Sequence, residues 1–333
     1  MDLGSVQKYF YHAEYLIAFA TNDRNFFNGS HAVLFHNHAD DFFPDDIPKY
    51  RFLHQRFIMY YFEPVMFSNR QTFESAPEHF FNCTFSWRRF SDIASSQYGE
   101  YRLKPSSFQR KISADEYDLE ESLDNYYGIN ITAKSIMAAW FSSHCDTEVK
   151  REDFVFELKK YIRVDVYGKC GNLTCPNEAI KSHEGCEDML GRDYLFYLSF
   201  ENSLCPDYVT EKLYRPLVVG AVPVVFGAAH YSRHAPPHSY INALEFPSPK
   251  DLADYLKVLS ENRKLYAHYF EWRRHFEAVK HSTSDWCELC EKLNDNSLPP
   301  KSYKNIEHWW FDYFPCLDYQ WKSNDSAVRD LSA

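Results

Sequence analysis

The sequence predicts an α/β protein that is built from two domains. Its 333 residues exceed what a single domain usually holds. Short apolar runs alternate with helical patterns, which is typical of parallel sheets covered by helices. We expect an N-terminal α/β domain over residues 1–130, a second α/β domain over residues 131–280, and a cysteine- and aromatic-rich tail over residues 281–333 that packs back on the body.

In the first domain, three apolar runs predict buried strands. They lie at residues 32–36, 55–62 and 79–87. The segment between the second and third strands, at residues 69–77, reads as a loop. Residues 98–127 are charged and loop-like, so the domain boundary is placed near Gly128.

In the second domain, strands and helices alternate more clearly. The expected strands cover residues 136–141, 163–168, 197–200, 222–226 and 242–246, and the expected helices cover residues 147–161, 249–262 and 266–281. One more helix follows the polar loop 201–206, with Asp207 as a plausible N-cap and Gly220 at its end. This strand–helix–strand unit places its loop at the carboxyl edge of a parallel sheet, where ligands bind in doubly wound folds.

The start of that helix suits an anion. A helix N-terminus offers unpaired amides and a partial positive charge, and Lys212 adds a full charge, so a phosphate or diphosphate fits there. Glu211 is a hydrogen-bond acceptor and suits the hydroxyls of a ribose or another sugar. Taken alone, a capping Glu211 and a solvated Lys212 explain the two residues equally well.

Composition narrows the classes of function. The formal net charge is −11 and no basic patch stands out, which argues against nucleic acid and anionic lipid as partners. The sequence has no run of about 18 apolar residues that could span a bilayer. Its first residues lack the pattern of a signal peptide.

Nine cysteines and five Asn-x-Ser/Thr acceptors together favour the secretory pathway. The acceptors are Asn28, Asn82, Asn130, Asn172 and Asn324. Crowding of cysteines between positions 170 and 205 indicates a disulfide framework rather than a zinc site. One hypothesis pairs Cys145 with Cys205, which lie on adjoining edge loops. The disulfide candidates are Cys145, Cys170, Cys175, Cys186, Cys205, Cys287, Cys290 and Cys316, and the odd count leaves one thiol over.

The stretch 196–227 resembles the donor-binding signature of the α1,3-fucosyltransferases, glycosyltransferase family 10. The family pattern is close to FYLSFENS-x-x-x-DY-[IV]-TEK-[LF], followed by a GxVPVVxG turn. This sequence has FYLSFENS at 196–203, DYVTEKL at 207–213 and GAVPVVFG at 220–227. Weaker matches extend the resemblance from about residue 73 to about residue 310.

The resemblance implies the GT-B architecture, in which two Rossmann-like α/β domains face each other across a cleft. It implies transfer of L-fucose from GDP-fucose, with inversion, to the O3 of N-acetylglucosamine in N-linked glycoprotein glycans. We expect no cofactor beyond this donor. The sequence has no Asp-x-Asp at a strand end to hold a divalent metal, so fixed cations and amide dipoles would meet the leaving-group charge.

For the catalytic base, the resemblance points to Glu74. Similar enzymes have Phe-Glu-Ser-Pro before an Arg-Arg-x-Ser-Asp motif. This chain has Phe-Glu-Ser-Ala-Pro at 73–77 before Arg-Arg-Phe-Ser-Asp at 88–92, so Ala76 is a departure from the pattern. A solvated loop acid is the alternative for Glu74, and Glu63 and Asp92 are rival bases.

For the donor phosphate, the resemblance selects Arg151. Similar enzymes bind this phosphate with an arginine that has an aromatic residue three positions on and a leucine seven positions on, and both spacings hold here. An exposed helical arginine is the alternative. With Arg151, the expected donor-binding residues are Tyr167, Gly168, Asn202, Tyr208, Glu211 and Lys212, while Glu201 is expected to brace the loop.

Family members are mostly Golgi proteins with one N-terminal membrane anchor. The resemblance therefore implies the lumenal portion of a type II membrane protein whose anchor is absent from this sequence. The main alternative is a non-catalytic relative that binds glycan or nucleotide, and the presence of Glu74, Arg151 and Lys212 argues against it. A glycoside hydrolase would need two carboxylates across one bond and has no obvious use for these cations.

Overall fold

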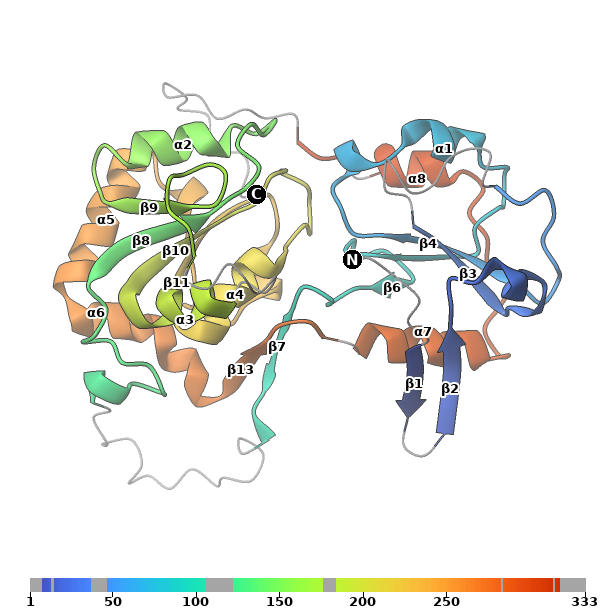
Figure 1. Cartoon of the computed structure of the whole chain (residues 1–333), viewed down its shortest axis with the longest axis horizontal. Coiled ribbons are helices and arrows are strands. Elements are labelled where there is room, and N and C mark those ends of the chain that lie inside the picture. The colour runs from blue at the N-terminus through green and yellow to red at the C-terminus, as the bar shows by residue number, and fades with distance from the viewer. Residues whose placement is uncertain are drawn as a thin grey trace. The chain divides into compact units, whose positions relative to one another are not determined.

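The protein folds into two compact α/β units. The structure, a computed structural model, describes residues 8–12, 15–36, 47–105, 122–175, 184–282, 284–313 and 315–317 (Figure 1). One unit comprises Met1–Gln97 with Ser282–Cys316, and the other comprises Tyr98–His281 with Leu317–Ala333. The division falls after Gln97 rather than at residue 130, and most of the expected tail belongs to the first unit. The reason is that residues 100–103 pair with a strand of the second unit.

The second unit contains a five-stranded sheet whose neighbouring strands are all parallel. Its strands are β8 (Ile136–Phe141), β9 (Val164–Tyr167), β10 (Tyr194–Phe200), β11 (Val222–Phe226) and β12 (Ile241–Asn242). Their order in the sheet is β12-β11-β10-β8-β9, so the chain reverses direction across the sheet at β8. In such a doubly wound sheet, the switch point lies between the first and third strands, at the carboxyl ends of β8 and β10.

Alternate residues along the strands pack on opposite faces of this sheet. Val224 and Phe226 join one core cluster, whereas Val225 joins another. Helices α2 and α5 contribute side chains to the first cluster, whereas α4, which contacts α3, contributes to the second, so these helices cover opposite faces of the sheet (Figure 1). The helices of this unit are α2 (Arg151–Leu158), α3 (Glu184–Asp193), α4 (Glu211–Val219), α5 (Pro249–Glu261) and α6 (Arg263–Ala267).

Helix α4 begins and ends for local reasons. The N-cap is Thr210, whose hydroxyl accepts from the Lys212 N–H, and not the expected Asp207. Asp207 instead has a φ of 66° in the loop before it. Gly220 ends the helix with a φ of 89°, and its N–H donates to the Pro216 carbonyl. The left-handed conformation and the close Ile129 side chain both favour glycine there.

An antiparallel pair completes this unit. Strand β7 (Glu100–Leu103) pairs with β13 (Phe276–Val279). The helix expected at 266–281 is therefore wrong: α6 is followed by a 3₁₀ segment, His268–Arg274, and then by β13. The other 3₁₀ segments of the described chain are Arg24–Gly29, Val65–Phe67, Leu123–Asn125, Tyr231–Arg233 and Ala243–Glu245.

The first unit is built on a four-stranded parallel sheet with the order β3-β4-β5-β6. Its strands are β3 (Ala32–His36), β4 (Arg56–Tyr61), β5 (Cys83–Ser86) and β6 (Ile93–Ala94), and β1 (Lys8–His12) pairs with β2 (Tyr15–Ala20) as a separate hairpin. Its helices are α1 (Arg70–Ser75), α7 (Ser284–Asn294) and α8 (Ile306–Phe311). Each unit thus has a parallel sheet with helices, which confirms the predicted α/β class.

Helix α1 occupies the segment where the sequence predicted a loop. Asn69 caps it, since its side chain accepts from the Thr72 N–H at 3.3 Å. Buried Phe73 faces Trp310 of α8, and the two rings stack with centroids 6.3 Å apart. A six-residue helix of this kind is stabilised by tertiary packing rather than by its own propensity, so the sequence pattern did not reveal it.

Candidate functional site

The loop after β10 and the start of α4 form a polar centre at the switch-point edge. Glu201 follows β10 directly, and its side chain is almost completely buried. Its Oε1 accepts from the Thr210 N–H and hydroxyl, each at 2.9 Å. Glu201 therefore braces the loop against the N-cap of α4, as the sequence predicted.

Lys212 lies in the first turn of α4 with its side chain 19% exposed. Its Nζ is 3.2 Å from Glu201 Oε2 and donates to the Thr210 hydroxyl at 2.8 Å. Burial opposes the charge, but the Glu201 and Glu211 carboxylates outweigh this effect and raise the pKa of Lys212. The ammonium thus stays charged beside the N–H groups of a helix N-terminus, which is an arrangement that can bind an anion.

Glu211 is shared between two cations. Its Oε1 lies 3.4 Å from Lys212 Nζ. Burial works against the carboxylate, yet Lys212 and Arg215 together lower the pKa of Glu211 and keep it an acceptor. Arg215 is itself held by Glu187 of α3 at 3.2 Å and by the Tyr197 hydroxyl at 3.1 Å. Sequence reasoning missed this support from Glu187 and Arg215, because it depends on how α3 packs on α4.

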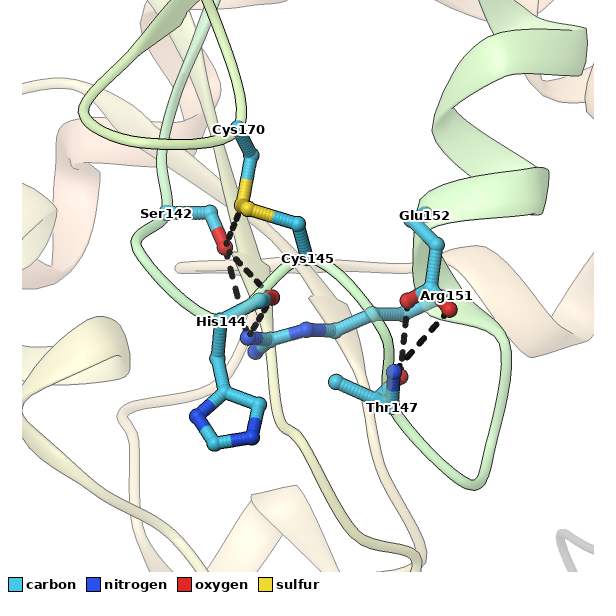
Figure 2. Close-up of a disulfide and its surroundings, with 7 residues drawn as sticks. All are labelled: Ser142, His144, Cys145, Thr147, Arg151, Glu152 and Cys170. Atoms are coloured by element: carbon cyan, nitrogen blue, oxygen red, sulfur yellow. Dashed lines mark hydrogen bonds between the residues drawn. A yellow bond between two sulfur atoms is a disulfide. The ribbon is translucent and has the colours of Figure 1, made fainter.

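Arg151 lies under the same edge rather than on it. It begins α2 and is only 3% exposed. Its guanidinium donates to the Phe200 carbonyl. It also donates at 3.4 Å to both the Ser142 hydroxyl and the His144 carbonyl (Figure 2). Burial lowers the pKa of Arg151, although an arginine remains charged in a protein. Arg151 is therefore not an exposed helical arginine. Its guanidinium is shielded from solvent in this structure.

A disulfide joins the loops that follow β8 and β9. Cys145 is bonded to Cys170, and the Cys170 sulfur lies 3.4 Å from the Ser142 hydroxyl (Figure 2). The hypothesis that pairs Cys145 with Cys205 is therefore wrong. Because β8 lies between β9 and β10, the loop carrying Cys145 adjoins both neighbouring loops, and the sequence could not choose between them.

The remaining cysteines divide into bonded and free residues. Cys175 is bonded to Cys186, and Cys205 and Cys316 are also disulfide-bonded. Cys287 and Cys290 both lie on α7 and are free thiols, as is Cys83 on β5. The expectation of disulfides at Cys287 and Cys290 is thus wrong, and the described chain has three free thiols rather than one.

The other expected donor-binding residues differ in their placement. The Tyr167 ring points into the core, where its hydroxyl lies 2.8 Å from that of Tyr194. Tyr208 is also buried. Gly168 adopts a φ of 89° close to the Ser142 carbonyl, so its backbone can reach the edge. Asn202 Oδ1 is buried without a hydrogen-bond partner among the described residues, and as an amide oxygen it can accept a hydrogen bond.

Glu74 lies in the first unit, in the last turn of α1. Its side chain is 57% exposed, and Oε1 is 3.3 Å from Arg70 Nε one turn earlier. A carboxylate that is exposed in this way can act as a proton acceptor. Its rivals are less free: Glu63 is half-buried, and Asp92 accepts from the Thr84 N–H and the Tyr303 hydroxyl.

The glycosylation acceptors differ in access. Asn28, Asn130 and Asn172 are exposed. The Asn82 amide donates to the Lys301 carbonyl at 3.1 Å and its oxygen accepts from the Phe57 N–H, so this side chain is already engaged. Asn324 lies outside the described residues.

Two features are absent from the described residues. No group of three or more His, Cys, Asp or Glu side chains there is arranged to hold a metal ion. No helix among them is long and apolar enough to cross a bilayer.

Two family models match most of the chain. "Glycosyltransferase family 10 (fucosyltransferase) C-term" matches residues 131–309, and "Fucosyltransferase, N-terminal" matches residues 15–99. The chain belongs to glycosyltransferase family 10. The matched C-terminal region contains Lys212, Glu211 and Arg151, and the matched N-terminal region contains Glu74.

Named relatives agree with the family. The chain is 36% identical to "Alpha-(1,3)-fucosyltransferase C" of Drosophila melanogaster, covering 84% of this chain and 65% of the relative. It is also 36% identical to the Drosophila "Glycoprotein 3-alpha-L-fucosyltransferase A", covering 75% of this chain and 47% of the relative. "4-galactosyl-N-acetylglucosaminide 3-alpha-L-fucosyltransferase 9" of Rattus norvegicus is 32% identical, with 88% of this chain and 74% of the relative covered. The chain therefore spans less than two thirds of each Drosophila relative.

Proposed function

We propose that this chain transfers L-fucose from GDP-fucose to the O3 of N-acetylglucosamine in N-linked glycoprotein glycans, with inversion and an α1,3 product. The observation that carries the proposal is the charged Lys212 in the first turn of α4, at the switch-point edge of a parallel sheet. Membership of family 10 and the names of the relatives support the fucosyl group and the linkage.

On the donor side, Lys212 and the first N–H groups of α4 would hold the diphosphate and stabilise it as it leaves. Glu211 and the unpaired Asn202 Oδ1 are acceptors, so they suit hydroxyls of the ribose or fucose. Gly168 would allow the backbone to approach the donor closely. Tyr167 and Tyr208 would support the carboxyl edge of the sheet by packing. Arg151 would contribute its positive charge from beneath while it fixes the Phe200 carbonyl.

On the acceptor side, Glu74 would act as the general base. As the acceptor O3 forms its bond to the fucose anomeric carbon, the O3 proton moves to Glu74. The bond between that carbon and the phosphate oxygen breaks, and its electron pair leaves with GDP. Attack opposite the leaving group inverts the anomeric carbon.

We infer that no divalent metal or other cofactor is required, because Lys212 and helix amides can meet the diphosphate charge. We expect activity with excess EDTA to stay close to that without it. Complete loss on chelation, restored by Mn²⁺, would move the leaving-group role to a metal.

The proposed setting is the Golgi lumen, and the proposed fold type is GT-B. The full-length protein would be a type II membrane protein. The acidic net charge disfavours nucleic acid, so the partners are the nucleotide sugar and a glycan acceptor on glycoproteins.

Calorimetric titration with GDP, GDP-fucose, UDP and GMP tests the donor site. We expect the guanine diphosphates to bind more tightly than UDP or GMP, because both the diphosphate and the base are recognised. A non-catalytic relative would bind one of these ligands or a glycan but release no GDP on addition of acceptor. Binding of none of the four nucleotides would contradict the proposal.

Two variants separate the proposed catalytic role of Glu74 from the proposed donor-binding role of Lys212. Glu74→Gln should abolish transfer and leave the dissociation constant for GDP nearly unchanged. Lys212→Ala should weaken GDP binding and transfer together, whereas Lys257→Ala, which removes a lysine of an exposed pair with Asp254 on α5, should change neither. Near-full transfer by Glu74→Gln would remove Glu74 as the base, and Glu63 would be the next residue to test.

A further inference from the structure

Arg70 ties the candidate base to a helix from the far end of the chain. Helices α1 and α8 lie side by side in the first unit (Figure 1). The Arg70 guanidinium contacts three carboxylates: Glu74 at 3.3 Å, Glu307, and Asp312 at 3.9 Å. It also stacks over the Phe311 ring at 4.8 Å. An ordinary exposed pair one helical turn apart has no such anchors on a second helix.

We propose that Arg70, which is anchored on α8, is a positioning residue that fixes the Glu74 side chain for proton abstraction. The inference rests on the proposed role of Glu74 as the base. Glu307, whose side chain is 14% exposed, and Phe311 fix the guanidinium, and the guanidinium in turn fixes the rotamer of Glu74. The segment after α7, which contains α8, would therefore contribute to catalysis as well as to packing. General-base catalysis requires a carboxylate held within hydrogen-bond reach of the hydroxyl.

The charge balance of this cluster suits a base. A cation paired with one carboxylate alone would oppose its protonation, because proton transfer would leave the cation unpaired. Arg70 has Glu307 and Asp312 as further partners, so it stays compensated when Glu74 takes a proton. Arg70 can thus fix the position of Glu74 without locking its charge.

Opposite charge changes should therefore move the pH–rate profile in opposite directions. In Arg70→Gln, carboxylates remain without their cation, so the acid limb of kcat/KM should move to higher pH. In Glu307→Gln, Arg70 is less compensated, so the acid limb should move to lower pH. For partly exposed groups each shift should be about half a pH unit. Arg70→Gln should also lower kcat by roughly tenfold through lost positioning, with the KM for GDP-fucose unchanged.

Other charged groups around the pair are controlled in the same experiment. His308 of α8 lies 3.2 Å from Asp312, so all profiles are measured in a His308→Asn background. Arg102→Gln and Glu277→Gln remove the two sides of an Arg–Glu pair in the second unit, with Nε and Oε1 2.8 Å apart. These matched variants should leave the profile in place. Circular dichroism and unfolding midpoints establish that each variant is folded.

The inference would be overturned if the acid limb moved in the same direction in Arg70→Gln and Glu307→Gln, or if it moved in neither. A purely structural loss lowers the rate without moving the acid limb. The companion Glu74→Gln variant separates this failure from failure of the proposed function. If Glu74→Gln is inactive while Arg70→Gln has the parent profile and kcat, only the positioning role falls. If Glu74→Gln is active, the base assignment falls with it.

Discussion

Lys212 Nζ lies 3.2 Å from the buried Glu201 carboxylate, and this pair links the end of β10 to the start of α4. Thr210 stands between them, because it caps α4 and donates to Glu201 through both its N–H and its hydroxyl. Ser199 adds a hydrogen bond from β10 to the Lys212 carbonyl at 2.7 Å. The cation that we assign to the diphosphate is therefore held by an ion pair and hydrogen bonds within one strand–helix junction.

Removing the charge of Glu201 should weaken this junction. In Glu201→Gln the half-buried ammonium loses its buried partner, and the Thr210 N–H loses a charged acceptor. We expect the free energy of unfolding to fall by about 1–3 kcal/mol. Urea unfolding measures this loss, with Asp254→Asn in an exposed pair on α5 as the control that should cost less than about 1 kcal/mol. Equal small losses in the two variants would show that the buried pair does not stabilise the junction.

Glycine at position 168 should be required for the structure of the carboxyl edge of the sheet, and Gly128 provides a matched comparison. Both have positive φ angles, of 89° and 85°. A Cβ at Gly168 would lie 2.7 Å from the Ser142 carbonyl, whereas one at Gly128 meets nothing within 4 Å. Gly128→Ala should therefore cost about 1–2 kcal/mol through conformation alone. Gly168→Ala should cost more and should also weaken GDP binding, because the loop that holds Arg151 must move.

Calorimetry with GDP and urea unfolding of both alanine variants check this comparison. If Gly168→Ala matched Gly128→Ala in stability and bound GDP like the parent protein, the close approach to Ser142 would have no role in the site.

The sequence predicted those elements that depend on local patterns. Strand β8 was predicted with the bounds Ile136–Phe141, since a parallel strand buried on both faces is a continuous apolar run. The segment 276–279 was predicted as helix, because its pairing with β7 is a contact over more than 170 residues in sequence. Helix α1 was missed for a similar reason, since packing of Phe73 on Trp310 stabilises it.

Within the candidate site, the family motif located the charged residues but did not predict their hydrogen-bond and ion-pair partners. Lys212 and Glu211 were identified from the helix start and the family pattern. That Arg151 faces the Phe200 carbonyl follows from the position of α2 under the sheet, which no spacing encodes. The same holds for Arg70, whose partners Glu307 and Asp312 lie over 230 residues further on. Such contacts depend on tertiary structure and leave no local signal.

The buried position of Arg151 predicts a loss of stability as well as of function. In Arg151→Met the Phe200 carbonyl loses its donor, and the Ser142 and His144 loop loses its attachment to α2. We expect the unfolding free energy to fall by about 2–4 kcal/mol and GDP binding to weaken. Arg163→Met, which removes an exposed guanidinium that pairs with the half-buried Asp165, is the control. Unchanged stability with lost GDP binding would instead show that Arg151 leaves this position and grips the phosphate directly.

Lys134 should make the stability of the second unit depend on pH. Its side chain is almost fully buried, and burial lowers its pKa to about 7, while Nζ donates to the Gly191 and Tyr194 carbonyls. A neutral amine keeps two N–H groups, which suffice for both carbonyls. Between about pH 7 and the ordinary lysine pKa near 10.4, the unfolded chain binds a proton that the folded chain does not, so stability rises with pH.

We therefore expect the unfolding free energy to increase by about 1.5 kcal/mol between pH 7 and pH 8.5 from this group alone. Lys134→Met removes the titrating amine, so its urea midpoint should lack this rise. Lys159→Met, at an exposed lysine that follows α2, should keep it. The same slope in Lys134→Met as in the parent protein would assign the pH dependence to other groups. It would also mean that the two carbonyls hold Lys134 in its charged form.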